Sequence, residues 1–385
     1  MTSSNLPSGP HYEPFGWHQW PDDFWMSYQF RRGLGETQEG GGAVSEIFQA
    51  ASKIVPNDFE SWFREWTHIA ERNDRRGDEE AAQRHVRSAM NCWLRAANYF
   101  REAEFWLKAD DPRRLPTFDR CERASQKFLA HLTPKAEVVE IEYEPGKPLP
   151  AYFIRSANGG GKQPVLISVG GLDSFKDELW FMTGRGALQR GISVLLVDGP
   201  GQGGALRRHG LVTRHDYEVP IGKCIDWLEQ RSDVDASRIA VSGSSLGGYY
   251  AARAGAIWDI HERWKSRDEN HGLAGHIKWV FGAKTMAEAT EIARPFTLLG
   301  VLEHMKCPYL IIHGGHDVLG VESVRRVHDY AKAHGVNATL RLTSEEETGA
   351  EHCQHDNPTL GQELMIDWLA DVFEIDQTKL SFYPG

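Results

Sequence analysis

The sequence predicts an α/β protein in which a helical domain precedes a mainly parallel, doubly wound sheet. After Pro134, short apolar runs alternate with helical patterns and Gly-containing turns, as in βαβ units. Before it, apolar residues recur at helical spacing without β-branched runs. The 385 residues also suffice for two domains or one large elaborated domain. We expect a helical cap over residues 1–135 and a sheet domain over 136–385, with a lid or insertion at 256–305.

Two amphipathic stripes support the helical domain. One comprises Phe59, Phe63, Trp66 and Ile69, and the other Val86, Met90, Trp93, Ala97 and Phe100. Asn57, followed by Glu60, is typical of a capping box at the start of the first helix. Residues 33–42 (GLGETQEGGG) are rich in glycine, and we expect them to form a flexible link.

The sheet domain is predicted from its apolar runs. These are residues 137–144, 151–155, 164–169, 192–198, 238–242, 308–313 and 338–343. The first two alternate as a hairpin would, whereas the later ones are continuous apolar runs of the kind buried on both faces. Because ligands of such sheets bind beyond the carboxyl ends of the strands, we expect the chemistry in the residues just after each run.

Composition narrows the class of protein. The net charge is −11, with no run of Lys and Arg, which argues against nucleic-acid binding. No apolar run is long enough to span a membrane. Five widely spaced cysteines without a CxxC pair favour a reducing compartment, and with no export signal evident we expect a cytoplasmic protein. Seven of the 13 tryptophans precede residue 110; we expect Trp62 to Trp106 to be core residues.

A nucleophile elbow is predicted at residues 243–247. The run 238–242 is followed by Gly-Ser-Ser-Leu-Gly, a GxSxG pattern, and then by a helical stretch. Small residues are needed around a serine held in a strained turn, and a helix N-terminus favours an oxyanion there. Ser245 is therefore the candidate nucleophile, the alternative being a tight turn with a buried, satisfied serine.

An acyl-transfer serine needs a base and a carboxylate that orients it, and in this fold the chain order is serine, carboxylate, histidine. Asp317 comes soon after the run 308–313 and is the candidate carboxylate. His352 follows the run 338–343 and an acidic loop, and is the candidate base. His355, three residues later, is its near competitor.

The oxyanion hole needs two backbone N–H groups near the serine. Leu246, the residue after Ser245, is the candidate for the first. The run 164–169 ends in Gly170-Gly171-Leu172-Asp173, whose glycines allow close approach to the serine. We favour Leu172 as the second donor, with Gly171 as the alternative.

Other patterns carry weaker alternatives. Residues 199–204 formally satisfy GxGxxG, but they follow a later strand, and no acidic residue closes a next strand as dinucleotide binding requires. A metal set can be drawn from His313, His316, Asp317, His352 and His355, although two of these are already assigned to the triad. Cys353 follows no elbow, and we interpret it as a packing residue.

Together, residues 170–174 (GGLDS), 198–203 (DGPGQG), 243–248 (GSSLGG), 313–317 (HGGHD) and 351–355 (EHCQH) resemble the α/β-hydrolase superfamily. The GGLDS and DGPGQG strings narrow the resemblance to the subgroup of 2,6-dihydroxypseudooxynicotine hydrolase and the fungal heptaketide-shortening, FrsA-like hydrolases. It covers most of the chain, including the helical N-terminus, and implies an α/β-hydrolase fold with an N-terminal helical cap.

The resemblance implies hydrolysis of a carbon–carbon bond next to a carbonyl, in an aryl ketone, β-dicarbonyl or polyketide-like substrate. Ser245 would be the nucleophile, His352 the base and then the acid, and Asp317 its orienter, with no metal or organic cofactor. The alternatives are a carboxylesterase, thioesterase or lactonase with the same triad, an acyltransferase or cyclase, or a non-catalytic binding protein. The subgroup also implies a homodimer.

One segment departs from the family pattern. After the nucleophile helix the chain runs into a polar stretch where another apolar strand is expected, and residues 277–281 (IKWVF) fit a strand or a helix. Either the sheet lacks a strand or the segment is rebuilt. Asp259, His261 and Glu262 in this stretch are candidates for an auxiliary acid, the alternative being a solvated lid face.

Substrate contacts are expected from both domains. The cap cluster of Phe24, Trp25, Tyr28 and Phe30 could roof an aromatic substrate. From the whole chain, the candidate substrate-binding residues are Trp25, Tyr28, Asp173 and Glu262.

Overall fold

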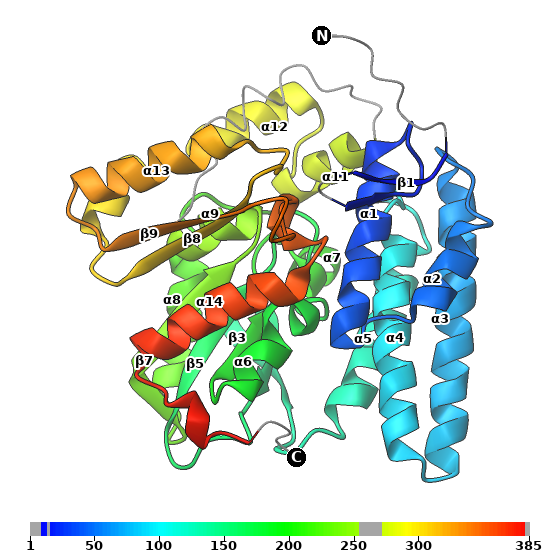
Figure 1. The fold of residues 1–385 in the computed structure, drawn as a ribbon, viewed down its shortest axis with the longest axis horizontal. Helices are drawn as coiled ribbons and strands as arrows, with labels where there is room; N and C mark the ends of the chain where they lie inside the picture. Colours follow the sequence, from blue (N-terminus) through cyan, green and yellow to red (C-terminus); the bar gives the residue numbers. More distant parts are fainter. Residues whose placement is uncertain (1–8, 14–15, 254–271, 382–385) are drawn as a thin grey trace.

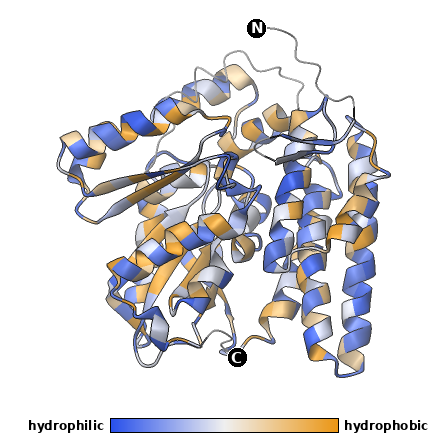
Figure 2. Ribbon diagram, in the orientation of Figure 1, coloured by the Kyte–Doolittle hydropathy of each residue, from blue (hydrophilic) through white to orange (hydrophobic). Residues whose placement is uncertain are grey.

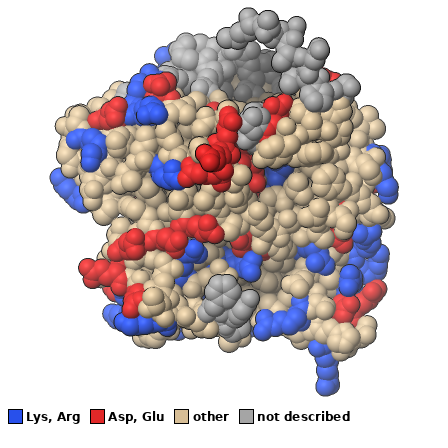
Figure 3. Space-filling view, viewed as in Figure 1, with Lys and Arg blue, Asp and Glu red and all other residues tan. Residues whose placement is uncertain are grey.

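The computed structural model describes residues 9–13, 16–253 and 272–381. A group of helices from the N-terminal third lies beside an α/β unit formed by the rest of the chain (Figure 1). Apolar residues concentrate in the strands and on the inward faces of the helices (Figure 2). On the face drawn in Figure 3, acidic and basic side chains are interspersed. In the ranges that the structure describes, no helix is both long and apolar enough to cross a membrane.

The N-terminal third is mainly helical, with a short hairpin that the helical periodicity does not predict. Its elements are β1 (His11–Glu13), β2 (Gly16–His18), α1 (Phe24–Gly35), a 3-10 turn (Glu36–Glu39), α2 (Val44–Ala51), α3 (Phe59–Ala82), α4 (Val86–Glu104) and α5 (Arg114–Leu129). Its core is aromatic: Trp62, Trp66, Tyr99 and Phe100 are all within 1% of complete burial. The core role predicted for Trp62 to Trp106 is thereby confirmed.

Two local predictions for this region are wrong. The cap of α3 is Asp58, whose carboxylate accepts the N–H groups of Glu60 and Ser61, because Asn57 lies in the left-handed region with φ 61°. Residues 33–42 are not a flexible link, since they include the end of α1 and a 3-10 turn in which Glu36 and Glu39 are buried. Glycine is needed at Gly35, where a Cβ atom would collide with the carbonyl oxygen of His355.

The α/β unit contains a five-stranded sheet in the order β3-β4-β6-β5-β7 and a β8-β9 pair. In the larger sheet β4 runs in the direction opposite to the other four strands; β8 and β9 are parallel. The strands are β3 (Glu137–Glu144), β4 (Lys147–Ile154), β5 (Gln163–Val169), β6 (Ser193–Val197), β7 (Val234–Gly243), β8 (Tyr309–Gly314) and β9 (Ala338–Thr343). The predicted runs and the hairpin of the first two are confirmed. Burial on both faces holds for β5 and β6 but is wrong for β7, β8 and β9, which are only partly buried.

Helices cover both faces of the larger sheet (Figure 1). Those that contact its strands are α6 (Arg185–Gln189), α7 (Gly203–His209), α8 (Glu218–Glu229) and α9 (Leu246–Ala252), and α14 (Pro358–Val372) shares a core with Leu166 of β5. Of the others, α13 (Val321–Ala333) packs on β8 and β9, and α11 (Gly272–Phe281) and α12 (Met286–Ala293) pack on each other. Alternate residues of β5 pack on opposite faces of the sheet: Val165 and Ile167 pack with α8 and α9, whereas Leu166 packs with α6 and α14. The mainly parallel, doubly wound sheet is therefore confirmed.

The segment between β7 and β8 is helical where the structure describes it. Residues 277–281 belong to α11, which settles the ambiguity between strand and helix in favour of the helix. In the described ranges, no strand joins β7 to β8, and the sheet is divided into five and two strands. Asp259, His261 and Glu262 lie outside the described residues, as does the first part of the predicted lid segment.

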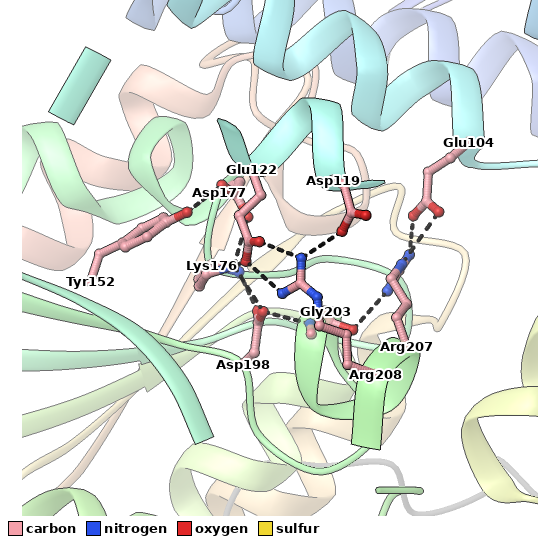
Figure 4. A network of polar contacts seen from close by, with 11 residues as sticks. Glu104, Asp119, Glu122, Tyr152, Lys176, Asp177, Asp198, Gly203, Arg207 and Arg208 are labelled. Atoms are coloured by element: carbon pink, nitrogen blue, oxygen red, sulfur yellow. Dashed lines mark hydrogen bonds and ion pairs between the residues drawn. The ribbon is translucent and has the colours of Figure 1, made fainter. Parts of the chain in front are cut away.

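Buried ion pairs join the helical region to the α/β unit. Lys176 Nζ lies 2.6 Å from Glu122 of α5, 3.1 Å from Asp177 and 3.2 Å from Asp198 (Figure 4). Arg207 of α7 also forms a buried pair with Glu104 of α4, whereas the partly exposed Arg208 reaches Asp119 of α5 at 2.7 Å. Because a buried charge without a partner is strongly destabilising, the buried pairs couple the two regions.

Candidate active site

Ser245 lies in a strained turn between β7 and α9. Its φ of 57° and ψ of −124° fall outside the regions that L-residues commonly adopt. Close packing of backbone explains the flanking glycines: a Cβ atom on Gly243 would collide with the carbonyl oxygen of Gly247, and one on Gly247 with that of Gly170. The turn thus has the strand-turn-helix context that the GxSxG pattern requires.

The three residues predicted as a triad lie in one hydrogen-bonded chain. His352 Nε2 is 2.9 Å from Ser245 Oγ, and His352 Nδ1 is 2.8 and 2.9 Å from the two carboxylate oxygens of Asp317. Asp317 follows β8, and its carboxylate also accepts the Leu319 N–H at 2.7 Å. The serine can therefore lose its proton to a histidine that a buried carboxylate orients.

Charge around His352 raises its pKa. Burial acts to lower the pKa, but the Asp317 carboxylate and the Cys353 thiol outweigh it and hold the pKa well above 6.5. For His355, burial and the Arg32 guanidinium lower the pKa well below 6.5. No hydrogen bond joins His355 to Ser245 in the described part of the chain, so the geometry favours His352 over its competitor.

The loop that follows β5 lies against the serine. We call residues 170–174 the oxyanion loop. Its Gly171 sits against the nucleophile, since a Cβ atom there would lie 2.7 Å from the Ser244 carbonyl oxygen. The Gly171 N–H, the alternative donor, is donated to Ser174 Oγ at 2.7 Å. Within the residues described, the N–H groups of Leu172 and Leu246 have no acceptor.

The motif at 199–204 supports the oxyanion loop. The Gln202 side chain donates to the carbonyl oxygens of Gly170 and Gly171, and accepts the Gly199 N–H at 3.1 Å. Asp198 accepts the Lys176 N–H at 2.7 Å and the Gly204 N–H at 2.8 Å. The GxGxxG string is thus explained by a turn that holds the loop in place.

The helical region contributes residues at the site through α1. The Tyr28 ring lies 6.2 Å from the His352 ring and 5.6 Å from that of His355, centroid to centroid. Its hydroxyl has no hydrogen-bond partner among the described residues. Trp25 stands edge-on to Tyr28 with centroids 6.0 Å apart. Phe30 is fully buried in the helical core, so its predicted place in a substrate roof is wrong.

Two buried arginines of α1 anchor catalytic loops, and the sequence analysis missed both. Arg31 forms a bidentate pair with Glu351, the residue before His352, with one contact of 2.7 Å. Arg32 pairs with Glu178 at 2.5 Å and reaches Asp173 of the oxyanion loop at 3.2 Å. Adjacent arginines in an amphipathic stretch give no signal of burial in a single sequence.

The remaining candidates are placed as follows. Asp173 is 20% exposed, and although burial acts to raise its pKa, Arg32 outweighs this and lowers it. In the candidate metal set, His316 instead pairs with the exposed Glu345. Across the described ranges, no three His, Cys, Asp or Glu side chains are arranged to hold a metal ion.

This fold, with an elbow serine, a carboxylate-oriented histidine and free N–H groups at the strand ends, defines an α/β hydrolase. More narrowly, the chain belongs to the FrsA-like esterase family, whose model matches residues 54–262. The protein is thus an enzyme of the α/β-hydrolase class, in the subgroup that its motifs indicate.

Known relatives extend the likeness beyond the matched region. The chain is 32% identical to hydrolase acrC of Aspergillus aculeatus, over 75% of this chain and 81% of the relative. It is 32% identical to 20-hydroxy-prefusarin hydrolase FUS2 of Gibberella moniliformis, over 74% and 81% respectively. The crystal structure of 2,6-dihydroxy-pseudo-oxynicotine hydrolase matches with a TM-score of 0.74 and 27% identity, over 88% of this chain and 95% of that one.

Proposed function

We propose that the protein is a serine hydrolase that cleaves a carbon–carbon bond next to a carbonyl, in an aryl-ketone, β-dicarbonyl or polyketide-like substrate. The chain of hydrogen bonds from Ser245 through His352 to Asp317 is the observation that carries the proposal. The structural likeness to 2,6-dihydroxy-pseudo-oxynicotine hydrolase and the relation to a prefusarin hydrolase support this class of substrate.

In the proposed reaction, Ser245 Oγ attacks the carbonyl carbon while His352 Nε2 takes the hydroxyl proton. The N–H groups of Leu246 and Leu172 stabilise the oxyanion, since that of Gly171 is already donated to Ser174. Collapse breaks the carbon–carbon bond and expels an enolate, which the protonated His352 protonates on carbon. Water, activated by His352, then hydrolyses the acyl-enzyme.

In this proposal Tyr28 assists the leaving group. Burial first, and then the nearby Cys353, raise the pKa of Tyr28 well above 10, so the phenol stays protonated and can donate a hydrogen bond. An enolate carries its charge on oxygen, and a neutral donor there stabilises it. In this proposal Trp25 and Tyr28 form the apolar wall, and the ionised Asp173 accepts a substrate hydroxyl.

A carboxylesterase is the second candidate, and the name of the matching family favours it. The same serine, base and oxyanion donors cleave an ester, whose alkoxide or phenoxide leaves without forming a carbanion. The two candidate reactions use the triad in the same way and differ only in the leaving group.

Product analysis separates the candidates. The enzyme is incubated with an aryl β-diketone and, separately, with a series of p-nitrophenyl esters, and the products are identified by mass spectrometry. We expect the diketone to give a carboxylic acid and a methyl ketone, with one ¹⁸O atom from labelled water in the acid. Rapid ester turnover with an intact diketone would overturn carbon–carbon cleavage and favour the esterase.

A further inference from the structure

A buried histidine outside the triad contacts the oxyanion loop. His276 lies on α11, and its Nε2 is 3.0 Å from the carbonyl oxygen of Leu172. Since a carbonyl only accepts, Nε2 carries the proton and donates it. The other ring nitrogen, Nδ1, is buried and has no hydrogen-bond partner. This ring is therefore a donor in a single tautomer, directed to the carbonyl of the residue proposed as the second oxyanion donor.

Other parts of the oxyanion loop have anchors of their own. Gln202 holds the carbonyl oxygens of Gly170 and Gly171, and Ser174 holds the Gly171 N–H. Arg32 holds the Asp173 carboxylate. The Leu172 carbonyl depends on His276. The Leu172 N–H belongs to the preceding peptide, whose carbonyl oxygen is that of Gly171. Gln202 therefore holds Leu172 from its amino side and His276 from its carboxyl side. Without the His276 contact, the main chain of Leu172, next to two glycines, would be free to shift and would carry its N–H out of place.

The surroundings of His276 keep its ring neutral and fixed. The ring stacks on Phe105, directly after α4, with 6.0 Å between the ring centroids and 16° between the planes. Burial first, then Arg114 of α5, lower its pKa to about 4, and Arg207 of α7 acts in the same direction. Asp173 acts in the opposite direction. Both arginines also lie over the Trp279 ring, one turn along α11. The pocket thus excludes an imidazolium.

We propose that His276 is a positioning residue of the oxyanion hole, which holds the Leu172 carbonyl so that the Leu172 N–H meets the oxyanion formed at Ser245. The proposal rests on the proposed serine mechanism and deepens it. Because the anchor matters most when charge develops on the substrate oxygen, its loss lowers kcat more than it raises KM. Through this hydrogen bond, the helices that pack around His276 also influence the position of the oxyanion loop.

Two substitutions separate the hydrogen bond from the packing. His276→Phe keeps an aromatic ring against Phe105 but has no N–H group, whereas His276→Gln keeps an amide N–H at a similar reach but loses the ring. Each variant is assayed with a p-nitrophenyl ester, so that the result does not depend on carbon–carbon cleavage. Affinity for an aryl trifluoromethyl ketone, whose adduct with a serine carries an oxyanion, is the second readout.

We expect His276→Phe to lower kcat about 10- to 100-fold with KM within about threefold, because a displaced donor can cost on the order of 100-fold. Affinity for the trifluoromethyl ketone should fall in parallel, and His276→Gln should recover at least part of both losses. Thermal unfolding of each variant checks that the fold is retained.

The proposal is overturned if folded His276→Phe keeps wild-type kcat and ketone affinity, or if it loses kcat while His276→Gln, equally folded, loses as much. Ser245→Ala tests the underlying mechanism separately. Full activity of Ser245→Ala would overturn both the serine mechanism and this inference. An inactive Ser245→Ala beside a fully active His276→Phe would overturn the role of His276 alone.

Discussion

The two sides of Ser245 hold histidines in opposite electrostatic surroundings. On one side, His352 lies against the buried Asp317 carboxylate, and its pKa is raised. On the other, His276 lies behind the oxyanion loop near Arg114 and Arg207, and its pKa is lowered to about 4. Both rings are buried, so burial alone does not explain the difference. The sign of the neighbouring charge does.

The difference matches what each ring is proposed to do. A base that later acts as an acid must accept a proton within the cycle, and a carboxylate stabilises that cation. A donor that only positions a carbonyl must keep one tautomer and never change charge. The site thus uses one residue type for two tasks and separates them by the charges that the surrounding helices supply.

Removing the carboxylate from the His352 side is the largest expected perturbation. Asp317→Asn keeps the shape of the side chain but loses the charge that stabilises an imidazolium. We expect kcat to fall by about 10⁴-fold, as when the triad carboxylate is neutralised in other serine hydrolases. Steady-state kinetics on a p-nitrophenyl ester measures this effect. His276→Gln is the matched control on the opposite side, and an Asp317→Asn variant losing less than His276→Gln would break the comparison.

A buried charge pair from the helical region comes next. Arg31→Ala leaves Glu351, beside His352, buried without its partner, and we expect the free energy of unfolding to fall by about 3–5 kcal/mol. Urea denaturation measures the change. Arg64→Ala is the control, since Arg64 is 60% exposed and its pair with Glu65 is worth at most about 1 kcal/mol. Equal effects of the two variants would show that Arg31 does not anchor the loop.

The sequence predicted the strands and the chemistry at their ends because both follow local rules. The glycines at residues 243–247 predict the nucleophile elbow. Asp317 and His352 are predictable because each follows an apolar run that forms a strand. The anchors were not predictable in this way. Gln202, Arg32 and His276 act on the oxyanion loop from elements 30 to more than 100 residues away in the chain. No periodicity or spacing relates such residues, and only the packed structure brings them together.

A smaller effect is expected from a substitution at Tyr28 of α1. Tyr28→Phe removes the hydroxyl proposed to stabilise an enolate while keeping the ring beside His352. We expect the rate of diketone cleavage to fall about 10-fold, as for loss of one hydrogen bond to a developing charge. Hydrolysis of a p-nitrophenyl ester, whose leaving group needs no such help, should change less than about threefold. Equal losses of rate on the two substrates would show that Tyr28 does not stabilise the leaving group.

The pH dependence is the finest test of the comparison. His352 must be neutral to accept the serine proton, so a raised pKa means that kcat/KM falls with decreasing pH through a value above 6.5. His276, with a pKa of about 4, should add no further limb above pH 5. ¹⁵N NMR of the histidine rings, assigned with single variants, follows both groups. An ordinary titration of His276 near pH 6.5 would contradict the proposed difference.

The account depends on Ser245 being the group that becomes acylated. Intact-protein mass spectrometry after treatment with a fluorophosphonate, followed by peptide mapping, tests this most directly. We predict a single phosphonyl adduct on Ser245, absent from Ser245→Ala and formed much more slowly by Asp317→Asn. An unlabelled but folded protein, or an adduct on any other residue, would contradict the account.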